Sequence, residues 1–100
     1  MPNESIFLVY CELSGNSLAL RKQGRAGAFV TCLVPSEDIV DAVRRAKIAL
    51  LEDEYEIVDI EKAMRFDPED WESDDEITRL AKDMQGDLDV RYSSFSSWGH

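Results

Sequence analysis

The chain has 100 residues, enough for one hydrophobic core, and we expect residues 1–100 to form a single domain. Its 44% hydrophobic content excludes a disordered chain, and no apolar run approaches the roughly 18 residues of a membrane-spanning helix. With a net charge of −10 and a pI near 4.4, most of the surface should repel nucleic acid and anionic lipid, so we expect neither as a partner.

Two strands are predicted in the first third of the chain. Residues 5–13 (SIFLVYCEL) and 28–34 (AFVTCLV) are rich in β-forming side chains and are apolar on both alternating faces. Each should therefore be an interior strand that is covered on two sides. The segment between them contains Gly15, Gly24 and Gly27 and is expected to be a long loop or an irregular hairpin arm.

A helix and a third strand are predicted next. Ser36 is the expected N-cap, and apolar residues at helical spacing continue over 39–51. The helix should end at 52–54 (EDE), a weak stop without glycine whose acids oppose the helix dipole. Residues 55–66 (YEIVDIEKAMRF) predict a strand, and its alternation changes face near Val58, which indicates a bulge.

The last third predicts a second helix and a fourth strand. Ser73 and Glu76 form a capping-box pattern, and an apolar stripe follows over 77–84. Apolar and polar residues then alternate over 88–92, which is typical of a half-exposed strand. Residues 93–100 (SSFSSWGH) should be either a polar edge strand or a tail.

The predicted order is β-β-α-β-α-β. Strands linked by helices imply crossover connections, so we expect an α+β fold with a four-stranded mixed sheet and both helices on one face. This is a two-layer α/β sandwich of ferredoxin-like character, an architecture that by itself carries no activity. The other, apolar face of the sheet then needs a cover, either the tail with Phe95 and Trp98 or a second copy. We therefore expect a homo-oligomer, most simply a homodimer.

Most of the acidic residues lie in the second half of the chain. Residues 1–50 carry six basic and five acidic side chains, whereas residues 51–100 carry five and sixteen. The densest stretch, 67–76 (DPEDWESDDE), does not fit a calcium-binding loop in either of two possible frames. It is expected to be a solvated loop that could also dock a basic protein. The candidate docking residues are Asp67, Glu69, Asp70, Trp71, Glu72, Asp74 and Asp75.

Three cations mark a second candidate site. Arg21, Lys22 and Arg25 lie in the glycine-rich segment before the second predicted strand, and they are possible contacts for a small anion. The sequence GRAG over residues 24–27 has the G-x-x-G form of an RNA-clamping loop, but it leads into a strand instead of joining two helices. A flexible, cationic loop is the simpler interpretation.

Catalytic and metal-binding chemistry has little support. The only histidine is His100, and Cys11 and Cys32 lie inside apolar runs where a thiol acts as a small buried hydrophobe. The N-terminal residues MPNESIFLVY lack the basic start of a signal peptide, so we expect a cytoplasmic protein.

We accordingly expect no enzyme, no metal and no cofactor. The predicted function is that of a small acidic binding protein that docks a basic partner. The alternative is a small-molecule sensor with its site at a homodimer interface, and a third hypothesis is an enzyme that uses paired carboxylates.

Overall fold

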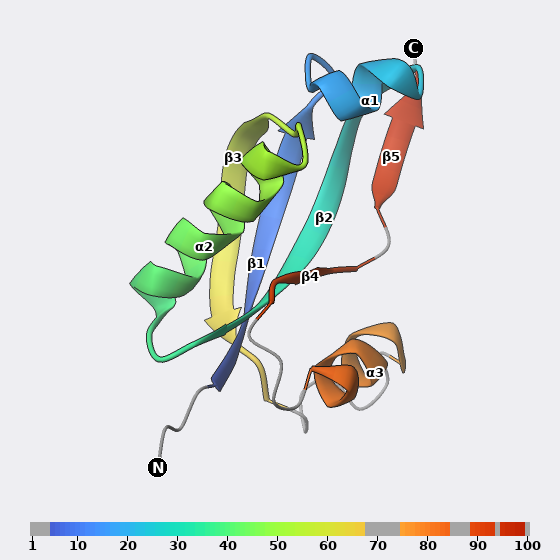
Figure 1. Ribbon diagram of the computed structural model, residues 1–100. Coiled ribbons are helices and arrows are strands. Elements are labelled where there is room, and N and C mark those ends of the chain that lie inside the picture. Colours follow the sequence, from blue (N-terminus) through green and yellow to red (C-terminus); the bar gives the residue numbers. More distant parts are fainter. Residues whose placement is uncertain (1–4, 68–74, 85–88, 94, 100) are drawn as a thin grey trace.

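The computed structural model describes residues 5–67, 75–84, 89–93 and 95–99. Within these residues the chain forms three helices and one five-stranded sheet (Figure 1). The elements in chain order are β1 (Ser5–Ser14), α1 (Leu18–Lys22), β2 (Arg25–Ser36), α2 (Ile39–Glu52), β3 (Ile57–Arg65), α3 (Asp75–Asp83), β4 (Arg91–Tyr92) and β5 (Ser96–Gly99).

The sheet is built around the hairpin of β1 and β2. The strand order is β3-β1-β2-β4, and β5 also pairs with β2. The β1–β2 register is unbroken from Ser5 opposite Ser36 to Ser14 opposite Gly27. The connection holds the short helix α1 where the sequence predicted only a loop. The bulge predicted near Val58 is confirmed, because the β1–β3 register shifts between the pairings of Asp59 and Ile57.

The predicted mixed sheet and β-β-α-β-α-β order are wrong. Every pairing is antiparallel, and α1 and β5 add two elements to the predicted order. β2 and β3 are joined through α2 and run in the same direction, as a crossover requires, but β1 lies between them. The hairpin therefore occupies the position that a parallel neighbour would take, and no parallel pair forms.

One face of the sheet packs against α2. Asp38 is the N-cap of α2, two residues later than predicted, and its side chain accepts a hydrogen bond from the Asp41 N–H at 2.8 Å. The helix buries Ala42, Ala46 and Leu50 against alternate residues of the hairpin. Those hairpin residues are Phe7, Val9, Cys11 and Leu13 of β1 and Ala28, Val30, Cys32 and Val34 of β2.

The opposite face packs against α3. Leu8 and Leu33 lie directly opposite one another on β1 and β2 and are fully buried beneath Ile77, Ala81 and Met84. Leu8 and Leu33 alternate along their strands with Val9 and Cys32, which pack on the α2 side, so α3 lies against the other face of the sheet. The prediction of two helices on one face is therefore wrong. The apolar second face, for which the sequence predicts either the C-terminal tail or a second copy as a cover, is covered in part by α3.

The C-terminal segment is an edge strand for part of its length. β5 pairs with β2 from Phe29 opposite Ser96 to Arg25 opposite Gly99. Phe95, just before β5, packs on the α2 side with Tyr55 and Tyr92 and not on the face that the sequence argument left open. The predicted fourth strand over 88–92 is reduced to Arg91–Tyr92 in the described residues.

Truncation of Leu33 tests the role of α3 as a cover. Leu33→Ala should lower the free energy of unfolding by about 2–5 kcal/mol, because it opens a cavity between β2 and α3. The matched control is Phe29→Ala, since Phe29 is on the same face of β2 but is 40% exposed. The control should cost clearly less in urea unfolding. Equal losses for the two variants would show that α3 does not seal this face.

Candidate binding cleft between α2 and β4

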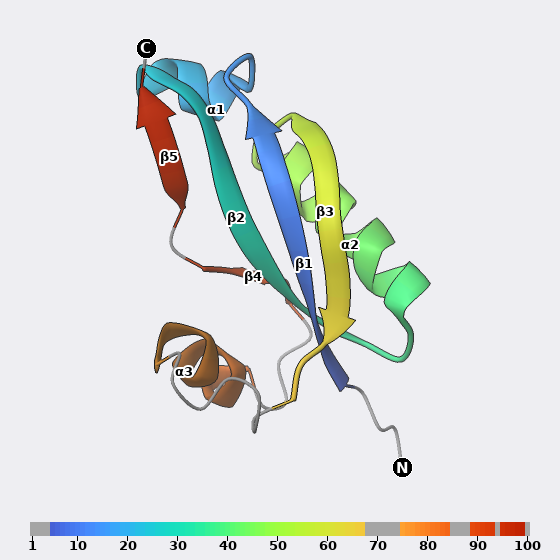
Figure 2. The same cartoon turned by 180° about the vertical axis from the view of Figure 1, so that it is seen from behind.

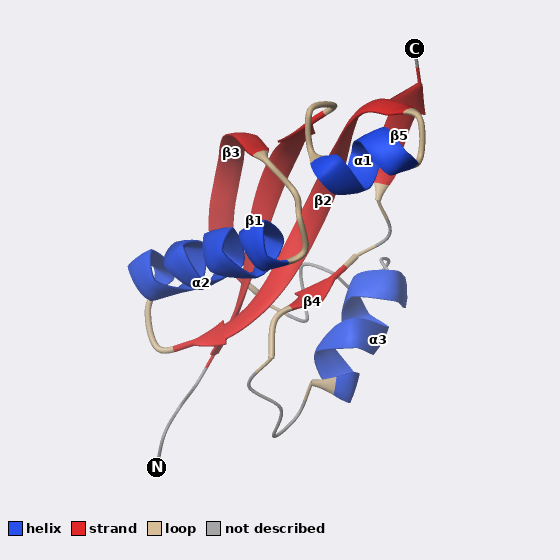
Figure 3. Cartoon of the chain, turned by 45° about the horizontal axis from the view of Figure 1, so that its top comes forward, coloured by secondary structure: helices blue, strands red, loops and turns tan. Residues whose placement is uncertain are grey.

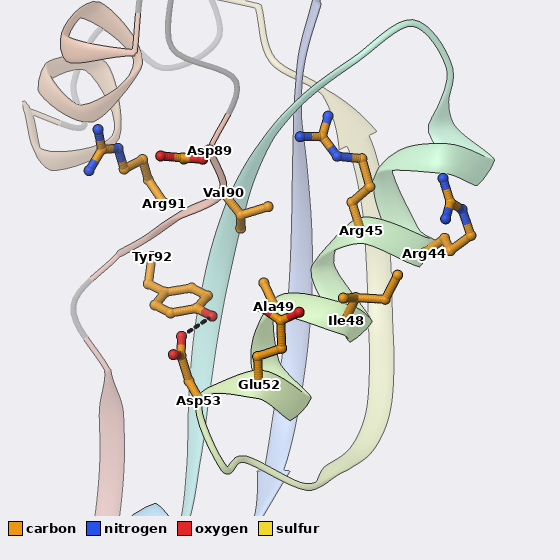
Figure 4. Close-up of a pocket in the computed structure, with 10 residues that line it drawn as sticks. All are labelled: Arg44, Arg45, Ile48, Ala49, Glu52, Asp53, Asp89, Val90, Arg91 and Tyr92. Atoms are coloured by element: carbon orange, nitrogen blue, oxygen red, sulfur yellow. Dashed lines mark hydrogen bonds between the residues drawn. The ribbon is translucent and has the colours of Figure 1, made fainter.

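A surface cleft of about 590 Å³ lies between α2 and the segment that leads into β4 (Figure 4). One wall comes from α2 and its C-terminal turn, and the other from residues 89–92. The lining residues are Arg44, Arg45, Ile48, Ala49, Glu52, Asp53, Asp89, Val90, Arg91 and Tyr92. Two apolar side chains, the half-exposed Ile48 and the partly buried Val90, therefore lie among charged groups of both signs.

The acidic end of the cleft is formed by Glu52, Asp53 and Tyr92. The Tyr92 hydroxyl donates a 2.6 Å hydrogen bond to the Asp53 carboxylate. Burial, followed by this hydrogen bond, raises the pKa of Tyr92 above its ordinary value. The phenol is therefore neutral at physiological pH and donates its proton to the Asp53 carboxylate.

Aromatic packing holds Tyr92 in place. The ring of Phe95 stacks on Tyr55 with centroids 5.1 Å apart and meets Tyr92 edge-on at 5.9 Å. Burial also raises the pKa of Tyr55, with a further contribution from the nearby Asp53 charge. These contacts join residues before β3, in β4 and before β5. The position of Tyr92 is thus set by packing as well as by its hydrogen bond.

The two arginines that α2 contributes to the cleft are held by other groups of the chain. Arg44 forms an ion pair with Asp41, one turn earlier on α2. This contact, together with a hydrogen bond from Ser36, lowers the pKa of the Asp41 carboxyl. Arg45 donates to the Pro35 carbonyl oxygen. Arg91 points away from α2 in Figure 4. The end of the cleft near Arg45 also contains Asp89 and is mixed in charge, whereas the charged residues lining the end beside the C-terminus of α2, Glu52 and Asp53, are both acidic.

The C-terminus of α2 combines two unfavourable features. Tyr55 N–H bonds to Leu50 O and Glu54 N–H bonds to Leu51 O, the pattern of a Schellman cap. Glu54 takes the left-handed position with φ of 69°, where glycine is strongly preferred. The last turn of α2 contains no basic residue, so its acids lie at the negative end of the helix dipole.

Hydrogen bonds from the β1–α1 region fix the backbone of this turn. Ser14 N–H donates to Glu56 O at 2.8 Å, and Ala19 N–H donates to Glu54 O at 3.2 Å. The hydroxyl of the buried Ser17 accepts from Glu56 N–H at 2.6 Å. Figure 3 shows α1 beside the loop that joins α2 to β3. The backbone that carries the acidic residues of this turn is therefore held by hydrogen bonds, which reduces the conformational entropy lost when a partner binds.

The acidic docking residues proposed from the sequence fall mostly outside the described residues. Residues 68–74, with Glu69, Asp70, Trp71, Glu72 and Asp74, are not described. Asp67 is exposed after β3, and Asp75 begins α3. The structure thus leaves that site a prediction.

The proposed anion contacts lie on different elements. Arg21 and Lys22 form the last turn of α1, Arg25 begins β2, and all three are exposed. Lys22 lies 3.5 Å from the Glu54 carboxylate, so one of the three cations faces an acid of the chain. An exposed pair of this kind contributes little to stability.

Sequence reasoning did not identify the cleft. Its acidic end does have a sequence signal, the run Glu52-Asp53-Glu54 at a helix end without glycine. Tyr92 was assigned only to a half-exposed strand, and its approach to Asp53 depends on a contact between residues 39 positions apart. No local pattern predicts such a contact.

The two cysteines are free and buried on adjacent strands beneath α2. A hydrogen bond with the Cys11 thiol and burial raise the pKa of Cys32. The predicted role as small buried hydrophobes is confirmed for both. Among the described residues, no group of three or more His, Cys, Asp or Glu side chains is placed to hold a metal ion.

Comparison with models of protein families, with curated proteins and with solved structures finds no match for this chain. Across the described residues, none of the helices has both the length and the apolar character to cross a membrane.

Replacement of Glu54 by glycine should stabilise the protein. Glu54→Gly relieves the left-handed backbone and removes an acid from the helix C-terminus, so the free energy of unfolding should rise by about 1 kcal/mol. Glu54→Ala is the control, because it removes the charge but keeps a side chain at φ of 69°. Urea unfolding measures both variants. An equal gain from alanine would mean that charge, not backbone conformation, destabilises this turn.

Tyr92→Phe tests the hydrogen bond to Asp53. The variant should lose about 1 kcal/mol of stability at pH 7. The raised pKa of Tyr92 favours the protonated phenol in the folded state, so its contribution is complete below about pH 10 and is lost as the pH rises further. Unfolding measured between pH 7 and 11 should therefore show a shallower alkaline loss in the variant. Identical slopes would show that folding does not raise the pKa of Tyr92.

Proposed function

We propose that this chain is a small cytoplasmic binding protein that docks a basic protein partner at the acidic end of the α2–β4 cleft. The observation that carries this proposal is the grouping of Glu52, Asp53 and the Tyr92 ring at one mouth of the cleft. Carboxylates and an aromatic ring together are suited to a lysine or arginine side chain. The exposed apolar surface of Ile48 offers a contact for its aliphatic stem.

The unfavourable local features of the turn support the proposal. Acids at a helix C-terminus and a glutamate in a left-handed conformation both lower stability, and proteins retain such features most often where they function. A bound cation would offset the repulsion among the carboxylates and the helix dipole. The net charge of −10 would also speed the approach of a cationic partner in a salt-dependent manner.

The alternative of an effector site between two copies receives no support from this cleft, because both walls belong to the same chain. The free, buried thiols of Cys11 and Cys32 are compatible with the reducing cytoplasm.

A lysine decapeptide is a suitable probe for the docking site. In an NMR titration at low salt, amide shifts should be largest at residues 48–54 and 89–92 and should fade as the salt concentration rises. The double variant Glu52→Gln/Asp53→Asn should weaken binding about fivefold or more.

The matched control for this titration is Glu37→Gln/Asp83→Asn. It removes the same charge from two exposed positions that do not line the cleft. Equal weakening by the two double variants would mean that net charge alone attracts the peptide. Shifts centred on residues 67–76 would place the docking site in the acidic run instead of the cleft.

A further inference from the structure

The flank formed by α2 and β3 lies on the other side of α2 from the cleft. β3 is the terminal strand of the sheet, and within the described residues it pairs only with β1. Its outer backbone edge is therefore open to another strand. Figure 1 and Figure 2 both show the N-terminal part of α2 extending past this edge.

Two hollows follow one another along this flank. The first, of about 500 Å³, is lined by Ile39, Val40, Val43, Arg44, Lys47 and Ala63. The second, of about 560 Å³, is lined by Lys47, Leu51, Glu56, Ile57, Val58, Asp59 and Ile60. Val40, Leu51 and Val58 are 76%, 64% and 57% exposed, so large apolar side chains face solvent in both hollows. Lys47 lines both hollows, and we call them the basic hollow and the acidic hollow after the net charge of all their lining residues.

The acidic and basic residues of β3 lie in different halves of the strand. Asp59 and Glu61 lie in its first half, and Lys62 and Arg65 lie in its second half. The ammonium of Lys62 is positioned over the Tyr10 ring, 4.9 Å from its centroid. A uniformly basic strand added to β3 would meet Lys62 and Arg65, and a uniformly acidic strand would meet Asp59 and Glu61. An added strand avoids both repulsions if its basic half lies beside Asp59 and Glu61 and its acidic half lies beside Lys62 and Arg65.

We propose that a second copy of this chain binds here, with β3 pairing antiparallel to β3 about a two-fold axis. Antiparallel pairing places the acidic half of each strand opposite the basic half of the other. In the register with Glu61 of one copy opposite Lys62 of the second, two such pairs form. The same register places Ile60 opposite Ala63 of the second copy. Both residues are on the α2 side of the sheet, because the register shift next to Glu61 interrupts the alternation of β3.

The two-fold axis also brings unlike hollows together. The basic hollow of one copy faces the acidic hollow of the other, so Arg44 and Lys47 approach Glu56 and Asp59 of the second copy. Val40 and Ile39, which lie on the part of α2 that extends past the edge, meet the apolar side chains Leu51 and Val58. This surface is complementary to itself in both charge and apolar contact, as a two-fold interface requires.

This dimer goes beyond the proposed docking function and does not depend on it. It uses the β3 side of α2, whereas the docking cleft is on the β4 side. The sequence predicts self-association through an open sheet face, but α3 partly covers that face. In the proposed dimer the two copies associate through a sheet edge instead.

Charge reversal at the centre of the interface tests the proposal. The wild-type protein should show a mass that rises with concentration from 11.4 kDa toward twice that value in sedimentation equilibrium. Glu61→Lys and Lys62→Glu should each weaken dimerisation about tenfold or more, because each turns two attractive pairs into repulsive ones. The swap variant E61K/K62E should restore the dimer, since the same pairs form with their signs exchanged.

Mixing the two single variants is the sharpest measurement. Glu61→Lys carries only lysine at the central pair and Lys62→Glu carries only glutamate, so a 1:1 mixture should form heterodimers where each variant alone is monomeric. Glu61 and Lys62 are both exposed, and circular dichroism and urea midpoints should confirm that each variant folds. Glu37→Lys is the control for the change in net charge and should leave the dimer intact.

Three results would overturn the proposal. They are a wild-type mass that stays at one chain up to millimolar concentration, single reversals that leave the dimer unchanged, and a mixture that forms no heterodimer.

Discussion

The structure depends on the burial of the β1–β2 hairpin on both of its faces. Alternation along a strand sends neighbouring side chains to opposite sides, so an apolar run such as Phe7 to Val9 requires two covers. α2 covers the side of Val9 and Cys32, and α3 covers Leu8 and Leu33. Three layers result, with the hairpin in the middle. The edge strand β3 and the short strands β4 and β5 are placed by their pairing with this hairpin.

α2 divides the functional surfaces because it lies over one face of the sheet and contributes residues to both of its own flanks. On the β4 side it contributes Ile48 and Glu52 to the cleft, and on the β3 side it contributes Val40, Lys47 and Leu51 to the hollows. Only three residues of α2 are buried in the core, namely Ala42, Ala46 and Leu50. The small side chains of the two alanines let the helix approach the hairpin closely, while much of its remaining surface stays available for contacts with other molecules.

Local patterns predicted most of the elements but not their arrangement. The strands over β1, β2 and β3 and the helices α2 and α3 were each located within a few residues, because apolar periodicity and turn signals act over short distances, although the N-cap of α2 is Asp38 and not Ser36. The pairing of β3 with β1 depends on contacts between residues about fifty positions apart. Periodicity says that a face is buried but does not say by which element, so α3 was placed on the wrong side of the sheet.

In the candidate sites, too, local features could be predicted from the sequence and long-range contacts could not. The EDE run of Glu52 to Glu54 could be recognised as an unusual helix end from the sequence, and the structure adds the left-handed conformation of Glu54. Its meeting with Tyr92 could not be predicted, since the aromatic contacts of Tyr55 and Phe95 with that region form only in the folded chain. The hollows beside β3 likewise depend on how far α2 extends past the sheet edge.

The separation of the core into two clusters has a consequence for how the molecule opens. Counted over the part of the chain that the structure describes, the cluster under α3 contains five buried residues, whereas the cluster under α2 contains twelve. A helix that buries less apolar surface detaches from the sheet at a lower free-energy cost. We therefore expect α3 to open as a separate cooperative unit while the hairpin and α2 stay folded. Amide protons of α3 would then exchange with solvent through partial opening, well before those of β1. Each such opening uncovers Leu8 and Leu33, which makes the partly open form the species most prone to aggregate.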